Sequence, residues 1–177
     1  DDTHIENDQK IDYLKKLEVA ASNDKKIVNT ESSFLQNKSN FILANSEGFC
    51  DGYRTSSFTS SSVVVAKDQN SMERDYEYST KCFFKDLEDS EELGKLAADQ
   101  TIRKLSPKKI GSEKIAIIFD KRIAKGMLSS FASAISSSAI SRGTSFLKDT
   151  VNEKIFSDTI NVFDKPDILK GLGSRCF

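Results

Sequence analysis

Between residues 26 and 84, the sequence contains consecutive strand signals joined by short turns. β-Branched and aromatic residues supply most of the apolar content of four runs: KIVNTESSF, NFILA, YRTSSFTSSSVVVA and MERDYEYST. The stretches NSEG (45–48) and KDQNS (67–71) have the composition of turns. Connections this short join antiparallel strands, because a parallel pair needs a crossover of about a dozen residues or more. The sequence therefore predicts an antiparallel meander.

Amphipathic helices flank the predicted meander. Residues 7–22 place four apolar side chains on one helical face: Ile11, Leu14, Leu17 and Ala21. A second helix begins at Asp89 or Ser90, with Glu92 placed as in a capping box, and ends before Pro107. Its predicted buried stripe consists of Leu93, Leu96, Ala97, Thr101 and Leu105. The predicted fold class is α+β, an antiparallel β-sheet meander flanked by amphipathic helices.

A second predicted domain follows the basic stretch LSPKKIGSE (105–113). The nearly all-apolar run EKIAIIFD (113–120) predicts a buried strand, and Asp120 then caps a serine-rich helix that ends at Arg142-Gly143. The apolar seam of this helix comprises Ile123, Met127, Phe131, Ile135 and Ala139. INVFD (160–164) predicts a last strand. We therefore expect two domains, residues 1–112 and residues 113–177.

Composition and charge exclude several classes of function. The 26 basic and 27 acidic residues nearly cancel, so no overall field attracts nucleic acid or an anionic membrane. No run approaches the ~20 apolar residues that span a bilayer. Cys50, Cys82 and Cys176 are irregularly spaced, which favours free thiols in a reducing compartment, the cytoplasm. The chain begins with Asp1 instead of Met, and we expect it to be a fragment.

No catalytic constellation emerges from the residues alone. The only histidine is His4, near a polar terminus, so no base is available for a Ser–His–Asp triad. One histidine and three scattered cysteines do not supply the ligands of a zinc site. The acidic runs EDSEE (88–92) and ERDYE (73–77) are interpreted as solvated surfaces.

The serine-rich helix nevertheless raises a question about its chemistry. Residues 126–138 read GMLSSFASAISSS, in which six of thirteen residues are serine. The serines can be small packing or interface residues, hydrogen-bonding groups for a substrate, or replacements of other functional side chains. The residues themselves do not choose among these alternatives.

Several motifs spread along the chain resemble the TldD/PmbA family. They are NSEGFCDGYRTSSFTSSSVVVA, MERDYEYS, LSPKKI, RGTSFLKD (142–149), IFSD and KGLGSRCF (170–177), and they occur in the family's order. The resemblance covers nearly the whole chain and is closer to the PmbA (TldE) branch than to TldD. It implies that the chain corresponds to the central domain and the opening part of the C-terminal domain of a longer protein.

The resemblance also implies a function and partners. The expected function is that of a non-catalytic TldE-like subunit of a TldD/TldE-type metallopeptidase that matures or degrades peptides in the cytoplasm. The expected partners are a TldD-like subunit or a second copy of the chain in a dimer, together with peptide substrates, and neither nucleic acid nor a membrane. Two alternatives remain: a metallopeptidase whose metal ligands lie outside this segment, and a protein-binding module that modulates DNA gyrase or another toxin target.

The resemblance offers an answer for the serines. In the TldD branch the corresponding helix carries His-Glu-x-x-x-His, and alignment on Gly126 places Ser130 and Ile135 at the two histidines and Phe131 at the glutamate. None of these three side chains supplies an imidazole ligand or a carboxylate base. The resemblance thus implies a replaced metal site, with neither catalytic residues nor cofactor in this chain and zinc in a TldD-type partner.

The RGTS stretch that follows the helix is a candidate substrate or interface site. Arg142 can hold a carboxylate, and Gly143, Thr144 and Ser145 can offer backbone N–H groups and hydroxyls. The resemblance implies that an extended substrate is held nearby by strand addition. The alternative is that the stretch is only a helix C-cap turn.

Overall fold

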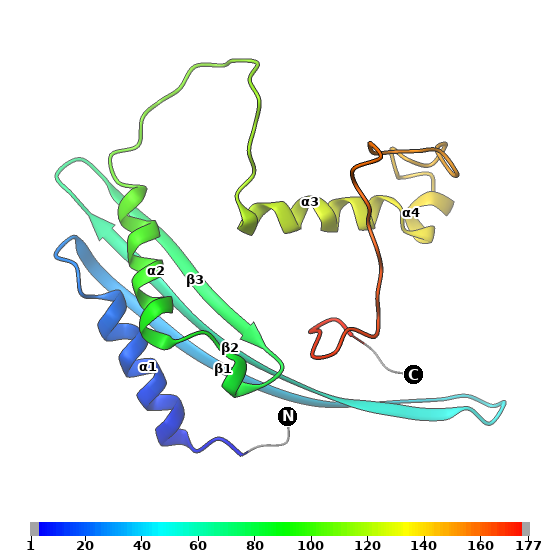
Figure 1. Ribbon diagram of the computed structural model, residues 1–177, viewed down its shortest axis with the longest axis horizontal. Coiled ribbons are helices and arrows are strands. Elements are labelled where there is room, and N and C mark those ends of the chain that lie inside the picture. The colour runs from blue at the N-terminus through cyan, green and yellow to red at the C-terminus, as the bar shows by residue number, and fades with distance from the viewer. Residues whose placement is uncertain (1–3, 175–177) are drawn as a thin grey trace. The chain divides into compact units, whose positions relative to one another are not determined.

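The computed structural model describes residues 4–174 and contains one three-stranded antiparallel sheet (Figure 1). The strands are β1 (Ile27–Ala44), β2 (Cys50–Lys67) and β3 (Met72–Lys81), in the order β1-β2-β3. The predicted meander is confirmed. The two strands predicted between residues 26 and 44 are one strand, paired with β2 without interruption from Asn29 to Ala44. The polar residues between them do not end the strand, because a two-stranded ribbon exposes both faces to water.

Two helices cover one face of this sheet (Figure 1). α1 (Asn7–Ala21) packs on β1 and β2. α2 (Ser90–Arg103) follows the 3₁₀ turn η1 (Phe84–Asp86) and packs on β2 and β3. Alternate residues of β2 face the helices and are buried: Phe58, Ser60, Ser62, Val64 and Ala66. This alternation follows from the period of two of a strand with one covered face.

The two helices approach each other closely at Gly94. A Cβ atom on Gly94 would lie 2.4 Å from the Leu17 carbonyl oxygen and 2.9 Å from the Ala21 amide nitrogen. The Ala20 Cβ would lie 3.0 Å from the same added atom, and Ala20, Ala97 and Ala98 are all buried. The predicted stripes were partly wrong, because Ile11 and Leu96 are exposed on the outer sides of the helices.

Two acidic residues of β3 are buried beneath α2. Asp75 and Glu77 are only 5% and 8% exposed, so the interpretation of this run as a solvated face was wrong. Each carboxylate has a polar partner at the C-terminal end of α2: Lys104 Nζ lies 3.0 Å from Asp75 Oδ2, and Gln100 Nε2 donates to Glu77 Oε2 at 2.8 Å. Partners of this kind offset the cost of removing a carboxylate from water.

The described chain divides into two compact units. Unit 1 contains the sheet and its helices, up to Lys109, together with the segment from Lys165 onward, and unit 2 is Ile110–Asp164. Unit 2 contains α3 (Lys121–Ala134) and α4 (Ser137–Ser141). As predicted, Asp120 caps α3, with Oδ1 accepting from the Arg122 N–H at 2.9 Å. The predicted continuous helix was wrong, since it breaks at Ile135 and Ser136, and Ser136 caps α4.

The strands predicted at 113–120 and 160–164 are absent from the described part of the chain. Both segments are irregular and exposed, with Ile118 96% exposed. A strand needs a neighbour for its backbone hydrogen bonds, and the one sheet within residues 4–174 is built from β1, β2 and β3 alone. In the same range, no helix has both the length and the apolar character needed to cross a membrane. Cys176 lies outside the described residues.

Candidate functional site

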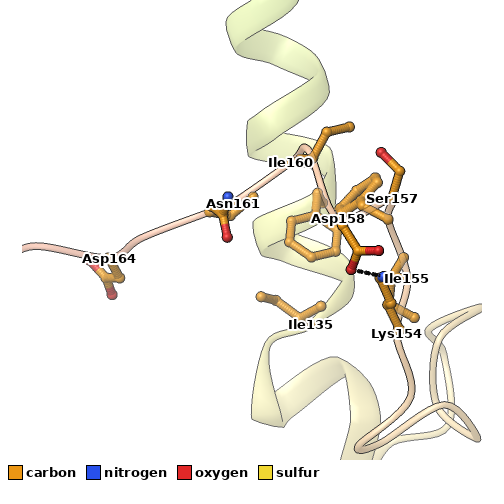
Figure 2. Close-up of a pocket in the computed structure, with 11 residues that line it drawn as sticks. Ile135, Lys154, Ile155, Ser157, Asp158, Ile160, Asn161 and Asp164 are labelled. Atoms are coloured by element: carbon orange, nitrogen blue, oxygen red, sulfur yellow. Dashed lines mark hydrogen bonds and ion pairs between the residues drawn. The ribbon is translucent and has the colours of Figure 1, made fainter.

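A cavity of about 490 Å³ in unit 2 brings two of the predicted positions together. Phe131 of α3 and Ile135, which caps the C-terminus of α3, line one side of it. The irregular segment 154–164 lines the other side (Figure 2). Lys154 and Asp158 form an ion pair at its rim, four residues apart in sequence. Ser157, Asn161 and Asp164 add further polar groups to this rim.

A second cavity, of about 390 Å³, shares Phe131 and is almost entirely apolar. Phe131 packs edge to face on Phe156, with ring centroids 4.9 Å apart and an interplanar angle of 63°. Ser130 also lines this cavity, and the other lining residues are all apolar: Met127, Leu128, Phe146, Leu147, Ile155, Ile160 and Val162. The two cavities together are called the Phe131 groove below. Its lining can contact apolar side chains, with charged and polar groups on one rim.

The three predicted positions of the replaced metal site do not fit a metal ion. Serine, phenylalanine and isoleucine at 130, 131 and 135 provide neither imidazole nor thiolate nor carboxylate. Within residues 4–174, no group of three or more His, Cys, Asp or Glu side chains is placed to hold a metal. His4 lies in the other unit, beside the exposed Glu6, with Nε2 3.3 Å from Oε1.

Half of the serines in the 126–138 stretch donate hydrogen bonds to their own chain. Ser129 Oγ donates to the Lys125 carbonyl at 3.1 Å, Ser133 Oγ to the Ser129 carbonyl and Ser136 Oγ to the Ser133 carbonyl, both at 2.9 Å. Such bonds satisfy a hydroxyl within the helix without a substrate. α3 has no buried residue, so these serines do not pack in a core of this unit either.

The RGTS stretch forms a helix C-cap. Gly143 has φ +67°, its N–H donates to the Ile140 carbonyl at 3.0 Å, and the Thr144 N–H donates to the Ala139 carbonyl at 3.1 Å. This is the Schellman pattern of paired hydrogen bonds that ends a helix in a left-handed residue. Ser145 is buried, and its Oγ accepts from the Leu147 N–H at 3.0 Å. The backbone N–H groups of Gly143 and Thr144 are therefore engaged within the cap, as the C-cap alternative requires. Arg142 is exposed at the same turn.

Sequence reasoning missed the contribution of residues 146–164 to the groove. Phe146, Phe156 and Val162 lie on segments without regular structure, where no periodic pattern reports which side chains converge. The Lys154–Asp158 ion pair was not predictable either, because a spacing of four residues brings side chains together in a helix, and this segment is irregular.

Two stretches of the chain match family models of known protein domains. Residues 1–105 match the family model described as PmbA/TldA metallopeptidase central domain, and residues 112–177 match that of the C-terminal domain. These two adjoining matches place the chain in a family of metallopeptidase type. The chain belongs to the PmbA/TldD family.

Individual relatives cover the chain almost completely. The Metalloprotease PmbA homolog of Buchnera aphidicola subsp. Acyrthosiphon pisum (strain APS) is 35% identical, and Metalloprotease PmbA of Escherichia coli O157:H7 is 33% identical, each over 98% of this chain. A crystal structure from Bacteroides thetaiotaomicron VPI-5482, which carries the name of a modulator of DNA gyrase, superposes with a TM-score of 0.90 at 27% identity over 97% of this chain. The chain spans 39% of the length of each of these three proteins.

Proposed function

We propose that the protein is a non-catalytic subunit of a PmbA/TldD-type metallopeptidase, working in the cytoplasm on peptides to be matured or degraded. One observation carries the proposal: in a chain of a metallopeptidase family, Ser130, Phe131 and Ile135 offer no imidazole, thiolate or carboxylate, and no group of three or more potential ligands within residues 4–174 is placed to hold a metal. The catalytic zinc then belongs to a TldD-like partner subunit. The groove of this chain contributes an apolar surface for the peptide or for the partner.

The proposal is tested by peptide hydrolysis with the full-length protein, alone and mixed with its TldD-like partner. We expect cleavage of an unstructured peptide only in the mixture, and its loss when a metal-binding histidine of the partner is replaced. Cleavage by the full-length protein alone that is abolished by a chelator would overturn the proposal.

A pair of variants links the activity of that mixture to the groove. Phe131→Asp places a charge in the apolar lining and is expected to lower the activity of the mixture. Ser138→Asp is the matched control, because Ser138 lies on the exposed surface of α4. Equal effects of the two substitutions would mean that the groove takes no part in the reaction.

A second candidate function is a metallopeptidase in its own right. The relatives named Metalloprotease PmbA favour it. This chain spans 39% of their length, so in this alternative the metal ligands lie in the remaining part of the full-length protein. This alternative predicts chelator-sensitive hydrolysis without a partner, which the first experiment measures directly.

A third candidate is a modulator of DNA gyrase, and the name of the Bacteroides structure favours it. With 26 basic and 27 acidic residues, this chain would act on the gyrase protein and not on DNA. A supercoiling assay with and without the full-length protein distinguishes this function, since a peptidase subunit leaves the rate of supercoiling unchanged.

A further inference from the structure

The segment Lys165–Ser174 follows unit 2 in sequence but packs with unit 1. Its residues are mostly exposed, and a tight turn shapes it: the Gly171 N–H donates to the Ile168 carbonyl at 2.9 Å, and the Ser174 N–H donates to the Gly171 carbonyl at 3.1 Å. The segment lies against the connection between β3 and α2, far from it in sequence. The question is what holds an exposed segment there.

Lys170 makes several of the contacts to that connection. Its Nζ lies 2.6 Å from Asp86 Oδ2 and 4.7 Å from the centre of the Phe83 ring. Its carbonyl accepts from Cys82 Sγ at 3.3 Å. The Lys170 ammonium also holds the pKa of the Asp86 carboxyl below its usual value, chiefly through their hydrogen bond.

The backbone of Lys170 is in an unfavourable conformation. Its φ is +58°, in the left-handed region that a residue with a Cβ rarely adopts. Such a conformation persists where surrounding contacts hold it. The ion pair and the ring contact of its own side chain are contacts of that kind.

We propose that Lys165–Ser174 is a releasable strap and that Lys170 is its latch on Asp86 and Phe83. The strap continues directly from the segment 154–164 that lines the Phe131 groove, and Asp164 is the last lining residue. Lys170 therefore follows the last lining residue of the groove by six positions in sequence. Because an ion pair and a cation–π contact near the surface are weak, the latch opens and closes in the folded protein.

The test is hydrogen exchange of the Gly171 and Ser174 amides in the full-length protein. Lys170→Met keeps the length of the side chain and removes its charge, and we expect exchange to rise about three- to thirtyfold. Lys85→Met is the matched control, since Lys85 is an exposed lysine next to Asp86. It should leave exchange unchanged. High salt should raise exchange in the unsubstituted protein by screening the ion pair.

Alkylation of the cysteines gives a second readout. Release of the strap removes the Lys170 carbonyl from Cys82. Lys170→Met should therefore raise the alkylation rate of Cys82 relative to that of Cys50, an exposed cysteine at the start of β2. Unchanged exchange and unchanged Cys82 reactivity in Lys170→Met would overturn the proposal, as would equal effects of Lys85→Met.

A pair of glycine variants tests the turn of the strap. A Cβ on Gly171 would lie 2.4 Å from Ser174 Oγ and 3.0 Å from the Ile168 carbonyl oxygen, whereas a Cβ on Gly173 would meet nothing within 4 Å. Gly171→Ala should therefore loosen the strap and raise exchange at Ser174, and Gly173→Ala should not. The same behaviour in both variants would show that the turn does not hold the strap in place.

Discussion

Both units carry helices with apolar seams, but only unit 1 buries such a seam among its own residues. Leu17, Phe58, Val64 and Ala97 are enclosed between α1, α2 and the sheet. In contrast, α3 has no buried residue, and its Ile123, Met127 and Leu128 are exposed. The same periodic signal therefore leads to two outcomes. Periodicity predicts that a helix forms and which face is apolar, whereas the covering of that face depends on what other segments supply.

The largest expected difference between the units concerns truncation of a phenylalanine. Phe58 is fully buried, and Phe58→Ala should lower the free energy of unfolding by about 3–5 kcal/mol. Phe131→Ala removes one partly exposed edge-to-face contact with Phe156 and should cost about 0.5–1.5 kcal/mol. Urea unfolding followed by circular dichroism measures both. Equal losses would show that unit 2 has a core comparable to that of unit 1.

Two helical glycines give a comparison with opposite signs. Gly94→Ala places a methyl group against the backbone of α1 and should destabilise unit 1 by about 1–3 kcal/mol. Gly126 lies in α3 with nothing within 4 Å of an added Cβ, so Gly126→Ala should stabilise the helix by about 0.5–1 kcal/mol. Thermal unfolding of the two variants checks the signs. A stabilising Gly94→Ala would mean that the helices of unit 1 are not in close contact.

The helix caps should behave alike in the two units. Asp89 Oδ1 accepts from the backbone N–H groups of Glu91 at 2.9 Å and Glu92 at 3.1 Å, and Asp120 Oδ1 accepts from the Arg122 N–H at 2.9 Å. Replacement of either aspartate by alanine should cost about 1 kcal/mol of helix stability. Amide exchange in the first turn of each helix measures this. A cap effect confined to unit 1 would show that α3 is not held by local interactions.

The smallest expected effect is a dependence on pH in unit 1. Hydrogen bonds from Asn70, Ser106 and Ser71 lower the pKa of Asp68 below its ordinary value of 3.8. Because the pKa is lower in the folded state, the stabilisation is present above pH 3.8 and is lost as the pH falls through the folded-state value.

Asp68→Asn is the variant that tests this dependence. Its free energy of unfolding should decrease less steeply with falling pH than that of the unsubstituted protein. Parallel pH profiles would contradict the role of Asp68 at the β2–β3 turn.

Local signals in the sequence predicted the elements of unit 1 well. The turns NSEG and KDQNS and the cap Asp89 all depend on neighbouring residues, and the structure contains each of them. The burial of Asp75 and Glu77 was not predictable, because it depends on Gln100 and Lys104 arriving from α2. Charge alternation along a strand does not indicate which face a helix will cover.

The Phe131 groove was only partly predictable. Its α3 side follows from helical periodicity, which places Met127 and Phe131 on one face. Its other side is irregular chain, where the run INVFD (160–164) was wrongly predicted as a strand, since an apolar run forms a strand only beside a partner strand. The position of the strap was not predictable from the sequence either. No sequence pattern indicates that a lysine such as Lys170 adopts a positive φ.

The most direct test of the proposed function is the metal content of the full-length protein after incubation with zinc and removal of unbound ions. We predict that it retains no stoichiometric zinc, while a TldD-like partner treated in the same way retains one ion per chain. Retention of one zinc ion per chain by the full-length protein itself would contradict the account, because the metal would then be bound by this protein and not by a partner.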